Sequence, residues 1–302
     1  MPAEEPSNFL FEDTGFFRVF LNTMQEGVYF LDPERRIQYW NPAAERISGF
    51  EAAEVLGKCC ADDILKHVDD AGANLCKDGC PMAGTIGDGK PRRARVYLSH
   101  KEGYRVAVDI SCVQVLDSAG NVAGGLETFQ EAVTLADADN PAMRCLTTGV
   151  PNRAFGEETL KRNLEEMRRQ HFALGALFIA VDRVIHINDT YGKQVGDLAL
   201  KMAARSLAAG LRPGDTLARW AGVEFLAILP RIKHIEAHGL AERLRMLVEN
   251  STRKLSNDRL RVTVSIGGCL CRPDDTAQSA INRLDRLVRE SRARGGNQVT
   301  ME

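Results

Sequence analysis

The chain has 302 residues, of which 44% are hydrophobic and 26% are charged, and its formal net charge is −2 at pH 7. This length and composition predict a globular protein with two domains and exclude a chain too polar to bury a core. Residues 1–140 hold 13 Lys and Arg against 23 Asp and Glu, whereas residues 141–302 hold 26 against 18. The basic second half favours an anionic ligand or, equally, attraction to the acidic first half.

Residues 1–13 are predicted to be an N-terminal tail. The stretch MPAEEPSNFLFED is acidic and lacks a basic region and a long apolar core, so it is not a signal peptide. The longest apolar runs, such as LGALFIAV at 174–181, are too short to cross a bilayer. We therefore expect a cytoplasmic protein with no membrane partner, whose eight cysteines are free, metal-bound or redox-active.

Residues 14–133 are predicted to form the first domain. A helix at the start is followed by strands VYFLD and IQYW, two short helices, and strands ARVYLSH, YRVAVDISCVQVLD and GGLETFQEA. This order predicts one antiparallel sheet around a ligand pocket. GVYFLDPERRIQYWNPAAERISGFEAAEVLGK and DISCVQVLDSAGNVAGGLETF resemble the opening and the closing strands of PAS sensor domains. The resemblance implies a sensor of a ligand, cofactor or redox state that forms a homodimer, and it does not name the ligand.

The unusual part of this domain is CCADDILKHVDDAGANLCKDGCP, residues 59–81. Cys60, His67, Cys76 and Cys80 are the soft sulfur and imidazole ligands that zinc prefers. The spacing of Cys76 and Cys80, with a glycine and a proline at the turn, suits a chelating loop. The sequence therefore predicts either a zinc site or a redox thiol site, and ordinary buried cysteines are the alternative.

Residues 134–144 are predicted to be a polar linker, and residues 145–302 a second domain. A turn that leads into an amphipathic helix is expected over 147–170, helices over 235–250 and 281–295, and a loop with a long helix over 186–211. Strands are expected at 176–182 and 261–271, with a hairpin between TLARW and EFLAILP at 216–230. Helices that alternate with strands in this order predict an α/β layer with one face of the sheet covered.

Several segments of the second domain resemble GGDEF domains. TTGVPNRAF resembles their LTGLPNR start, NDTYGKQVGDLAL their NDxxGHxxGDxxL helix and loop, and GGNQV their AKxxGRN end, while RWAGVEF falls where RxGGDEF belongs. The resemblance implies a ferredoxin-like nucleotidyl-cyclase core, so the whole chain is predicted to be α/β (α+β). The active members of this family are diguanylate cyclases, which join two GTP molecules into cyclic di-GMP across a dimer.

The residues that this catalysis uses are partly missing. Phosphoryl transfer from GTP needs a divalent metal held by carboxylates, which the family supplies from a DxD-like strand and from the third position of GGDEF. Those two positions hold Ala180 and Val223, so only Asp182 and Glu224 remain as vestigial acids, and Ala221 replaces the first glycine. The sequence predicts a degenerate site with no intact catalytic set and poor magnesium binding.

Other positions of the nucleotide site are altered or retained. Ile185 stands in place of a lysine and Gly296 in place of the arginine of GRN. Arg292 occupies the position of a phosphate-binding lysine and can supply the same charge. Asn188 and Asp197 match the guanine-reading pair of the family. Alternatively, Asn188 caps a turn and Asp197 N-caps the helix that follows.

The stretch LRPGDTL, residues 211–217, resembles the RxxD inhibitory site of the family, which binds cyclic di-GMP. A Pro-Gly pair at the centre of a four-residue turn brings Arg212 and Asp215 within about 7 Å of each other. Arg243 matches the second arginine of that site. Two arginines beside a carboxylate suit phosphates and a guanine edge, and the alternative is a solvated surface pair.

These residues predict a cyclic di-GMP signalling protein in which a PAS sensor is coupled to a degenerate GGDEF domain that binds cyclic di-GMP. One alternative is a weak diguanylate cyclase that uses Asp182, Glu224 and a displaced metal. Another alternative is a module whose PAS state is read by a protein partner, with GTP binding only modulatory. No nucleic-acid partner is expected.

Overall fold

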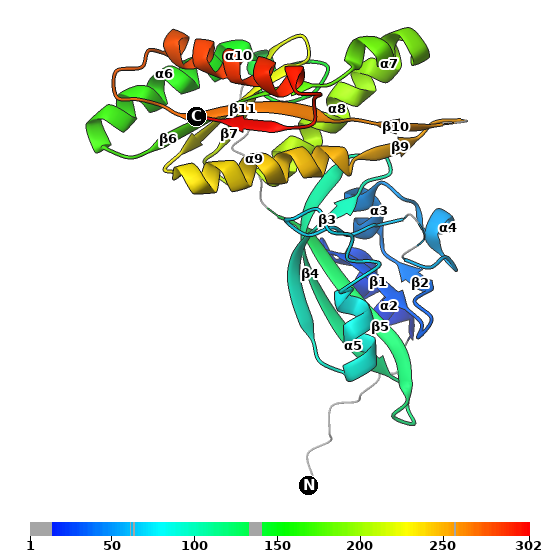
Figure 1. The fold of residues 1–302 in the computed structure, drawn as a ribbon. Helices are drawn as coiled ribbons and strands as arrows, with labels where there is room; N and C mark the ends of the chain where they lie inside the picture. Colours follow the sequence, from blue (N-terminus) through cyan, green and yellow to red (C-terminus); the bar gives the residue numbers. More distant parts are fainter. Residues whose placement is uncertain (1–13, 61, 63, 133–140, 257) are drawn as a thin grey trace. The chain divides into compact units, whose positions relative to one another are not determined.

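The structure is a computed structural model, and it describes residues 14–60, 62, 64–132, 141–256 and 258–302. The chain divides into two compact units (Figure 1). The first comprises the residues up to Asp69 with 73–101 and 107–132, and the second comprises 133–302 with the short segments 70–72 and 102–106. None of the helices in the described residues combines the length and the apolar character that a membrane span needs. Most of the predicted tail and linker lies outside the described residues.

The first unit is built on a single sheet with strand order β2-β1-β5-β4-β3 (Figure 1). β1 pairs antiparallel with β2 and β5, and β5 pairs antiparallel with β4, so the predicted antiparallel sheet is confirmed. The strands are β1 (Gly27–Leu31), β2 (Ile37–Trp40), β3 (Arg92–Ser99), β4 (Arg105–Leu116) and β5 (Val122–Glu131). The helices are α2 (Thr14–Thr23), α3 (Pro42–Ser48), α4 (Ala52–Val55) and α5 (Pro81–Asp88).

Asn41 shows why the short helix α3 begins where it does. Its side-chain oxygen accepts hydrogen bonds from Ala44 N and from Val28 N, at 2.8 Å and 2.9 Å, so it caps the helix and holds β1 at the same time. The helix starts with a proline, whose fixed φ suits the first helical position, and it ends at Gly49 with φ 76°. The capping residue is fully buried, which makes this contact part of the core.

The second unit is a mixed sheet of five strands in the order β12-β11-β6-β8-β7. Only β12 runs parallel to its neighbour, β11, and the other pairs are antiparallel. The strands are β6 (Leu174–Val181), β7 (Thr216–Ala221), β8 (Glu224–Pro230), β11 (Val264–Leu270) and β12 (Val299–Met301). The helices are η1 (Pro141–Met143), α6 (Arg153–Gln170), α7 (Val184–Tyr191), α8 (Lys193–Gly210), α9 (His234–Glu249) and α10 (Ala277–Ala293). A separate pair of strands is formed by β9 (Thr252–Lys254) and β10 (Arg259–Arg261).

Helices cover both faces of this sheet, so the expectation of one covered face is wrong (Figure 1). Along β6, Leu177, Ile179 and Val181 pack with α8 and α9, whereas Phe178 and Ala180 pack with α6 and α10. Every residue of β6 is buried. A strand that is apolar at every position, rather than at alternate positions, is the pattern expected for burial on both faces.

The segment expected to be one strand over 261–271 is interrupted. β10 ends at Arg261 and β11 begins at Val264, and between them Thr263 O accepts a hydrogen bond of 2.9 Å from Asp182 N. The segment after β6, expected to be a loop, contains the helix α7, which Gly192 separates from α8. Gly192 has φ 85°, a conformation that glycine adopts without a steric penalty.

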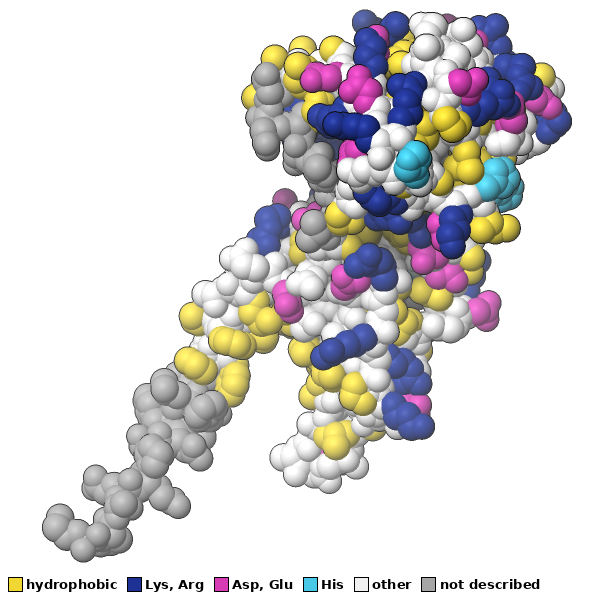
Figure 2. Space-filling view, turned by 90° about the vertical axis from the view of Figure 1, so that its left-hand side faces the viewer, with side chains coloured by type: hydrophobic (Ala, Val, Ile, Leu, Met, Phe, Trp, Pro, Cys, Tyr) yellow, Lys and Arg dark blue, Asp and Glu magenta, His cyan; other side chains and the backbone are white. Residues whose placement is uncertain are grey.

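Basic side chains are numerous on the surface of the second unit. In the upper part of Figure 2, Lys and Arg side chains gather on this unit with Asp and Glu among them. This distribution agrees with the excess of basic residues in the second half of the sequence. The surface therefore suits an anionic ligand better than a cationic one.

Candidate functional site

The hairpin between β7 and β8 is closed by a tight turn at Gly222, which has φ 48°. The guanidinium of Arg219 donates two hydrogen bonds to Gly222 O, from Nε at 3.1 Å and from Nη2 at 2.6 Å. Ala221 lies opposite Glu224 across the strand pair. The turn is therefore held by arginine and backbone contacts, and it places Glu224 at the first position of β8.

Of the two positions where the predicted metal ligands are missing, one lies in the core and the other packs against it. Ala180 is fully buried and lies in register with Glu224 on β8 and with Ser265 on β11. Val223 packs against the apolar cluster of the second unit, and its carbonyl accepts a 2.9 Å hydrogen bond from Val181 N. Neither side chain offers an oxygen to a cation.

The carboxylate of Asp182, the acid that remains after β6, already accepts hydrogen bonds from other residues of the protein. Its Oδ2 accepts hydrogen bonds from Thr263 Oγ1 at 2.8 Å and from Asn297 N at 3.0 Å. Its Oδ1 accepts a hydrogen bond of 2.7 Å from Ser265 Oγ. The carboxylate thus joins the end of β6 to β11 and to the turn before β12, and a metal would have to compete with three donors.

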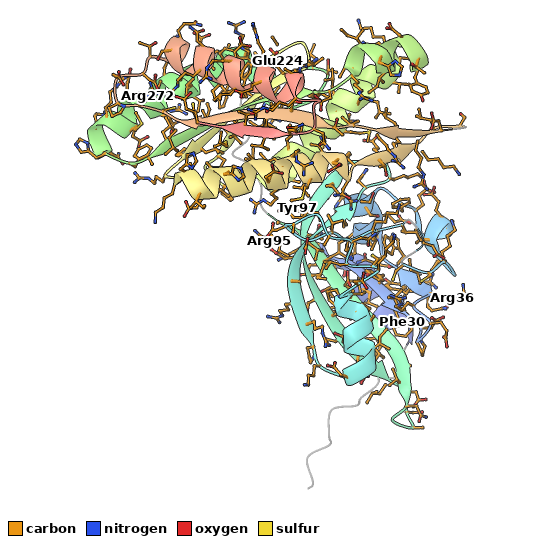
Figure 3. The ribbon with its side chains drawn as sticks, viewed as in Figure 1. Phe30, Arg36, Arg95, Tyr97, Glu224 and Arg272 are labelled. Carbon is orange, nitrogen blue, oxygen red and sulfur yellow. The ribbon has the colours of Figure 1, made fainter. Side chains whose placement is uncertain are left out.

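Glu224, the other remaining acid, lies near α10 (Figure 3). Its partial burial raises the pKa of the carboxyl, while Arg292 and Arg289 lower it and Asp285 raises it further. Among the residues that the structure describes, no group of three or more His, Cys, Asp or Glu side chains is arranged to hold a metal ion. Glu224 and Asp182 are therefore separate acids with different partners.

An open pocket of about 790 Å³ lies between α7, β10 and the turn after α10. Four arginines line it, and they are Arg183, Arg259, Arg261 and Arg292. Only Arg292 was predicted as a phosphate ligand from the sequence. Arg183 comes from a loop, and Arg259 and Arg261 come from the short strand β10. The sequence R-L-R could have predicted that the last two share a face, because residues two apart lie on one face of a strand. Guanidinium groups gathered in one pocket suit phosphate oxygens.

The predicted guanine-reading pair lies at the adjacent helices. Asn188 is within α7, and its Oδ1 is buried with no hydrogen-bond partner among the described residues. Gly196 faces this oxygen so closely that a Cβ there would lie 1.8 Å from it. Asp197 is inside α8, whose N-cap is Gly192, so the alternative that Asp197 caps the helix is wrong. Asn188 likewise belongs to a helix and does not cap a turn.

Arg212, Asp215 and Arg243 come together and are called the clamp below. Asp215 N donates a hydrogen bond of 3.0 Å to Arg212 O across the Pro-Gly turn, in which Gly214 has φ 98°. Arg212 Nε lies 3.3 Å from Asp215 Oδ1, and Arg212 Nη2 donates to Pro230 O at 2.8 Å. The predicted turn and its Arg–Asp contact are thus present in the structure.

The clamp combines a buried acid with two more exposed bases. The side chain of Asp215 is 1% exposed, and that of Arg212 is 51% exposed. Burial raises the pKa of Asp215, whereas the hydrogen bonds and charge of Arg212 and the charge of Arg243 lower it. Arg243 Nη2 donates to Gly210 O at 2.8 Å, and its Nε is buried with no hydrogen-bond partner among the described residues. The site therefore holds a fixed carboxylate beside two guanidiniums.

In the first unit, the residues of the predicted zinc set have different surroundings. His67 is buried, and its Nε2 lies 4.0 Å from Glu127 Oε1. Cys76 and Cys80 instead line an open pocket together with Arg35. The zinc assignment stays a prediction, and the structure adds Arg35 as a neighbour of the thiols.

Glu127 is a buried acid that the sequence analysis missed. It lies on β5, in register with Tyr29 on β1 and Cys112 on β4, and it is 1% exposed. Cys112 Sγ donates to its Oε2 at 3.3 Å. Burial raises the pKa of Glu127 to about 7, although hydrogen bonds with Cys112 and Tyr29 lower it. The signal in the sequence was the alternation of β5, in which Glu127 lies on the same face as Gly125 and Phe129.

Comparison with known proteins assigns both units. A family model described as the diguanylate cyclase GGDEF domain matches residues 146–298, and one described as the PAS fold matches residues 15–129. The chain belongs to the GGDEF domain family. Its first half carries a PAS domain, so both resemblances and the predicted fold class are confirmed.

Relatives of this GGDEF protein include diguanylate cyclase A of Treponema denticola, which is 36% identical over 129 residues. That match covers 42% of this chain and 35% of the relative. The response regulator PleD of Caulobacter vibrioides is 34% identical over 155 residues, which cover 50% of this chain and 34% of the relative. The matched parts of the chain thus span about one third of the length of these two relatives.

Two solved structures are similar to the GGDEF domain. The GGDEF domain of DgcB from Caulobacter crescentus, in complex with c-di-GMP, superposes with a TM-score of 0.52 at 26% identity, covering 55% of this chain and 96% of that one. Diguanylate cyclase SiaD from Pseudomonas aeruginosa, in complex with its activator SiaC, superposes with a TM-score of 0.52 at 30% identity, covering 53% and 62% of the two chains.

Proposed function

We propose that the GGDEF domain of this protein is a cyclic di-GMP receptor without cyclase activity and that the PAS domain is its sensor. The observation that carries the proposal is the clamp, in which Arg212 and Arg243 lie beside the buried carboxylate of Asp215. A solved relative, the GGDEF domain of DgcB, is in complex with c-di-GMP. Cyclic di-GMP is also the ligand that the RxxD resemblance implies.

The chemistry of the clamp fits the two parts of this ligand. Each guanidinium presents N–H donors in a planar fork that matches phosphate oxygens. A carboxylate accepts hydrogen bonds from the N–H groups of a guanine edge. Arg212 is half exposed and can turn toward a phosphate, and the unpaired Nε of Arg243 can gain a partner on binding. None of these contacts requires a metal ion.

The proposed loss of catalysis concerns residues that do not belong to the clamp. Ala180 and Val223 supply no carboxylate, and the carboxylate of Asp182 already accepts three hydrogen bonds. Magnesium prefers a near-octahedral set of oxygens, often with one or two protein carboxylates among them. The receptor function can outlast this loss because its residues are different ones.

Calorimetry of the full chain with cyclic di-GMP, in buffer containing EDTA, tests the proposal. We expect a dissociation constant in the micromolar range, which corresponds to about −8 kcal/mol. Arg212→Ala and Arg243→Ala should each weaken binding by roughly tenfold or more, because a charge-assisted hydrogen bond contributes about 1.5–3 kcal/mol.

Two further variants serve as controls. Arg289→Ala removes an exposed arginine from α10 near Glu224, at the opposite end of β8 from the Pro230 carbonyl that Arg212 contacts, and should leave the affinity unchanged. Asn188→Ala alters the predicted guanine pair and should also leave it unchanged. No binding at tens of micromolar, or equal affinity in Arg212→Ala, contradicts the receptor and leaves the protein-partner module as the better account.

A further inference from the structure

Four thiols of the PAS domain surround one arginine. Cys60 N donates to Arg35 O at 3.1 Å, and Cys59 forms an antiparallel bridge with the next residue, Arg36. The side chain of Arg35 is hydrogen-bonded to the thiol of Cys80. Together with Cys76, these residues form what we call the cysteine loop, which the proposed receptor function does not use.

Within the cysteine loop, two thiols are open to small molecules and one is not. Cys76 and Cys80 line an open pocket of about 400 Å³ that also exposes Arg35. Cys60 is 7% exposed, and its burial, followed by the charges of Cys80, Cys59 and Cys76, raises the pKa of its thiol. A buried thiol of raised pKa is a poor nucleophile. Cys76 and Cys80 are therefore the accessible pair.

Cys80 lies at the start of a helix and in contact with a guanidinium. It is the N-cap of α5, the helix that begins at Pro81, and its own carbonyl accepts the Gly84 N–H at 3.0 Å. A guanidinium in contact with the sulfur also presents several N–H donors to the oxygens of an approaching peroxide. Here Arg35 contacts the sulfur, and Cys76 opens into the same pocket.

We propose that Cys80 and Cys76 form a peroxide-responsive pair in which Cys80 is the attacking thiol and Cys76 the resolving one. The Cys80 sulfur attacks a hydroperoxide and breaks its O–O bond, a sulfenic acid forms, and the leaving oxygen takes the proton of the thiol and departs as water or an alcohol. The Cys76 thiol then attacks that sulfur, an S–S bond forms, and a water leaves. Two thiols are oxidised by two electrons, and the O–O bond of the peroxide is reduced.

Formation of this disulfide would also change the position of α5 against the sheet. Bond formation removes the Cys80 sulfur from Arg35 and closes the loop over Lys77, Asp78 and Gly79, in which Gly79 has φ 81°. α5 starts at the oxidised residue and packs against β5. Its buried Met82 lies so close to Gly125 of β5 that a Cβ there would be 2.3 Å from the sulfur. A shift of the helix start is therefore transmitted to the central sheet.

Peptide mapping of the full chain after treatment with hydrogen peroxide tests the pair. Trypsin cuts after Lys77, between the two cysteines, so peptides 67–77 and 78–92 stay joined only when the disulfide has formed. We expect the joined peptides without reductant and their separation with dithiothreitol. In Cys76→Ser, dimedone should label Cys80, because its sulfenic acid has lost the resolving thiol.

Arg35→Gln tests the activation of Cys80. We expect roughly tenfold slower oxidation at pH 7, because the charge-assisted hydrogen bond from the guanidinium to the peroxide is lost. Arg36→Gln is the matched control, because its guanidinium donates to Gly57 O, and it should oxidise at the unmodified rate.

Three results would overturn the proposal. The first is the absence of the joined peptides at peroxide concentrations that oxidise another thiol of the same sample. The second is a disulfide that joins other cysteines. The third is a purified protein that carries about one zinc per chain and loses it on mutation of Cys76 or Cys80, which assigns the cysteine loop to a metal. Binding of cyclic di-GMP to the GGDEF domain is measured separately, so failure of either proposal is recognisable by itself.

Discussion

Glu127 and Cys145 are two residues whose side-chain pKa values are shifted by their immediate surroundings. Glu127 is an acid in the apolar interior of the PAS domain, where burial disfavours the charged form. Cys145, just before α6, is contacted by the Arg219 guanidinium, whose Nη1 donates to its Sγ at 3.2 Å. The pKa values of the two residues shift in opposite directions, because burial outweighs the hydrogen bonds to Glu127, whereas hydrogen bonds from Thr148 and Arg219 outweigh burial at Cys145.

Glu127 should make the PAS domain less stable as the pH rises. Its pKa is about 7 in the folded state against an ordinary value of 4.5, so the folded state binds more protons between these values. The free energy of unfolding should fall from about pH 4.5 to about pH 7, by on the order of 3 kcal/mol at most. Urea unfolding at a series of pH values measures this slope.

Glu127→Gln is the control for this slope, because the amide keeps the shape of the side chain and does not titrate. Tyr29, Cys112, Cys60 and His67 surround the carboxyl and remain in the variant. We expect a flatter dependence on pH in Glu127→Gln. An unchanged slope would assign the pH dependence to one of these neighbours instead.

Cys145 should be alkylated quickly at neutral pH. Partial burial raises the pKa of the thiol, but hydrogen bonds from Thr148 and Arg219 outweigh it and lower the pKa to about 7. The rate of iodoacetamide labelling of peptide 145–153 should therefore reach half its maximum near pH 7. Arg219→Ala should move this midpoint upward by about one unit. Arg169→Ala, which removes an exposed arginine at the far end of α6 and leaves this peptide unchanged, should not move it.

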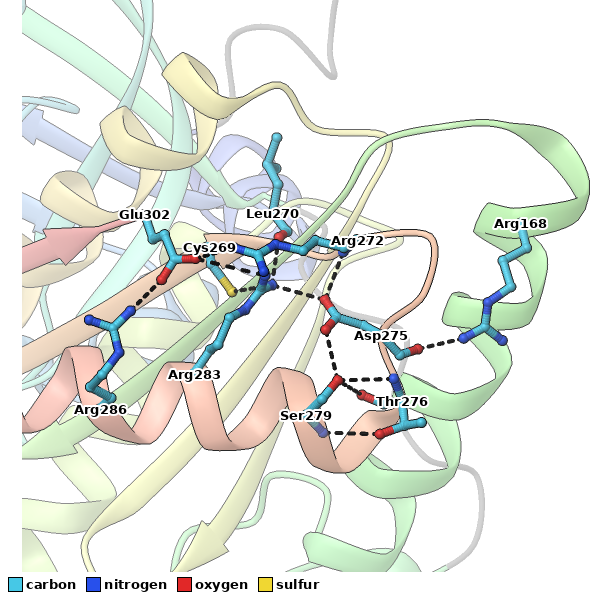
Figure 4. A network of polar contacts seen from close by, with 10 residues as sticks. All are labelled: Arg168, Cys269, Leu270, Arg272, Asp275, Thr276, Ser279, Arg283, Arg286 and Glu302. Atoms are coloured by element: carbon cyan, nitrogen blue, oxygen red, sulfur yellow. Dashed lines mark hydrogen bonds and ion pairs between the residues drawn. The ribbon is translucent and has the colours of Figure 1, made fainter.

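At the scale of secondary structure, a polar network fastens the start of α10 to the end of β11 (Figure 4). Arg283 Nη2 donates to Leu270 O at 2.8 Å and to Asp275 Oδ2 at 2.9 Å. Asp275 in turn accepts a hydrogen bond of 2.7 Å from Ser279 Oγ in the first turn of α10. The side chains of Arg283 and Asp275 are 15% and 7% exposed, so this ion pair is shielded from water.

Breaking this pair from one side should be costly. Arg283→Met leaves the buried carboxylate of Asp275 without its cation, and we expect the free energy of unfolding to fall by about 3 kcal/mol. Arg289→Met is the matched control on the same helix. The side chain of Arg289 pairs with Asp285 and is 75% exposed, so its loss should lower the free energy of unfolding by less than about 1 kcal/mol. Equal losses in urea unfolding of the two variants would contradict a special role for the buried pair.

At the scale of the whole molecule, catalysis in this family needs two chains, because its active members join two GTP molecules across a dimer. We expect the unmodified protein to form no cyclic di-GMP from GTP with Mg²⁺ or Mn²⁺ in a chromatographic assay. The paired change Ala180→Asp and Val223→Asp restores the missing carboxylates, and we expect it to be necessary for activity. Ile185 still occupies the position of a lysine, so the paired variant need not reach the activity of a natural cyclase.

The single variants are the control for this prediction. Each restores one carboxylate, and because a preorganised electrostatic partner is worth about a hundredfold or more in rate, each should stay far below the pair. Robust product formation by the unmodified chain would refute the proposed loss of catalysis. It would return Asp182 and Glu224 to the role of metal ligands.

The amino-acid sequence by itself determined the order of the two domains, most strands and helices, and the pairing of Arg212 with Asp215. These features depend on local patterns, which are strand alternation, helical periodicity and a Pro-Gly turn. Such a turn brings its two ends together independently of the rest of the fold. The apolar run of β6 also contained the signal for burial on both faces, although the sequence analysis expected only one.

Only the tertiary structure decided which side chains share surroundings. It placed Asp182 under donors from residues 263, 265 and 297, brought Arg259 and Arg261 to the pocket of Arg292, and set His67 against Glu127. Contacts between residues this far apart in the chain depend on how helices and strands pack, and no local pattern encodes them. The ionisation of Glu127 and Cys145 follows from the same packing, because burial and charged neighbours set a pKa.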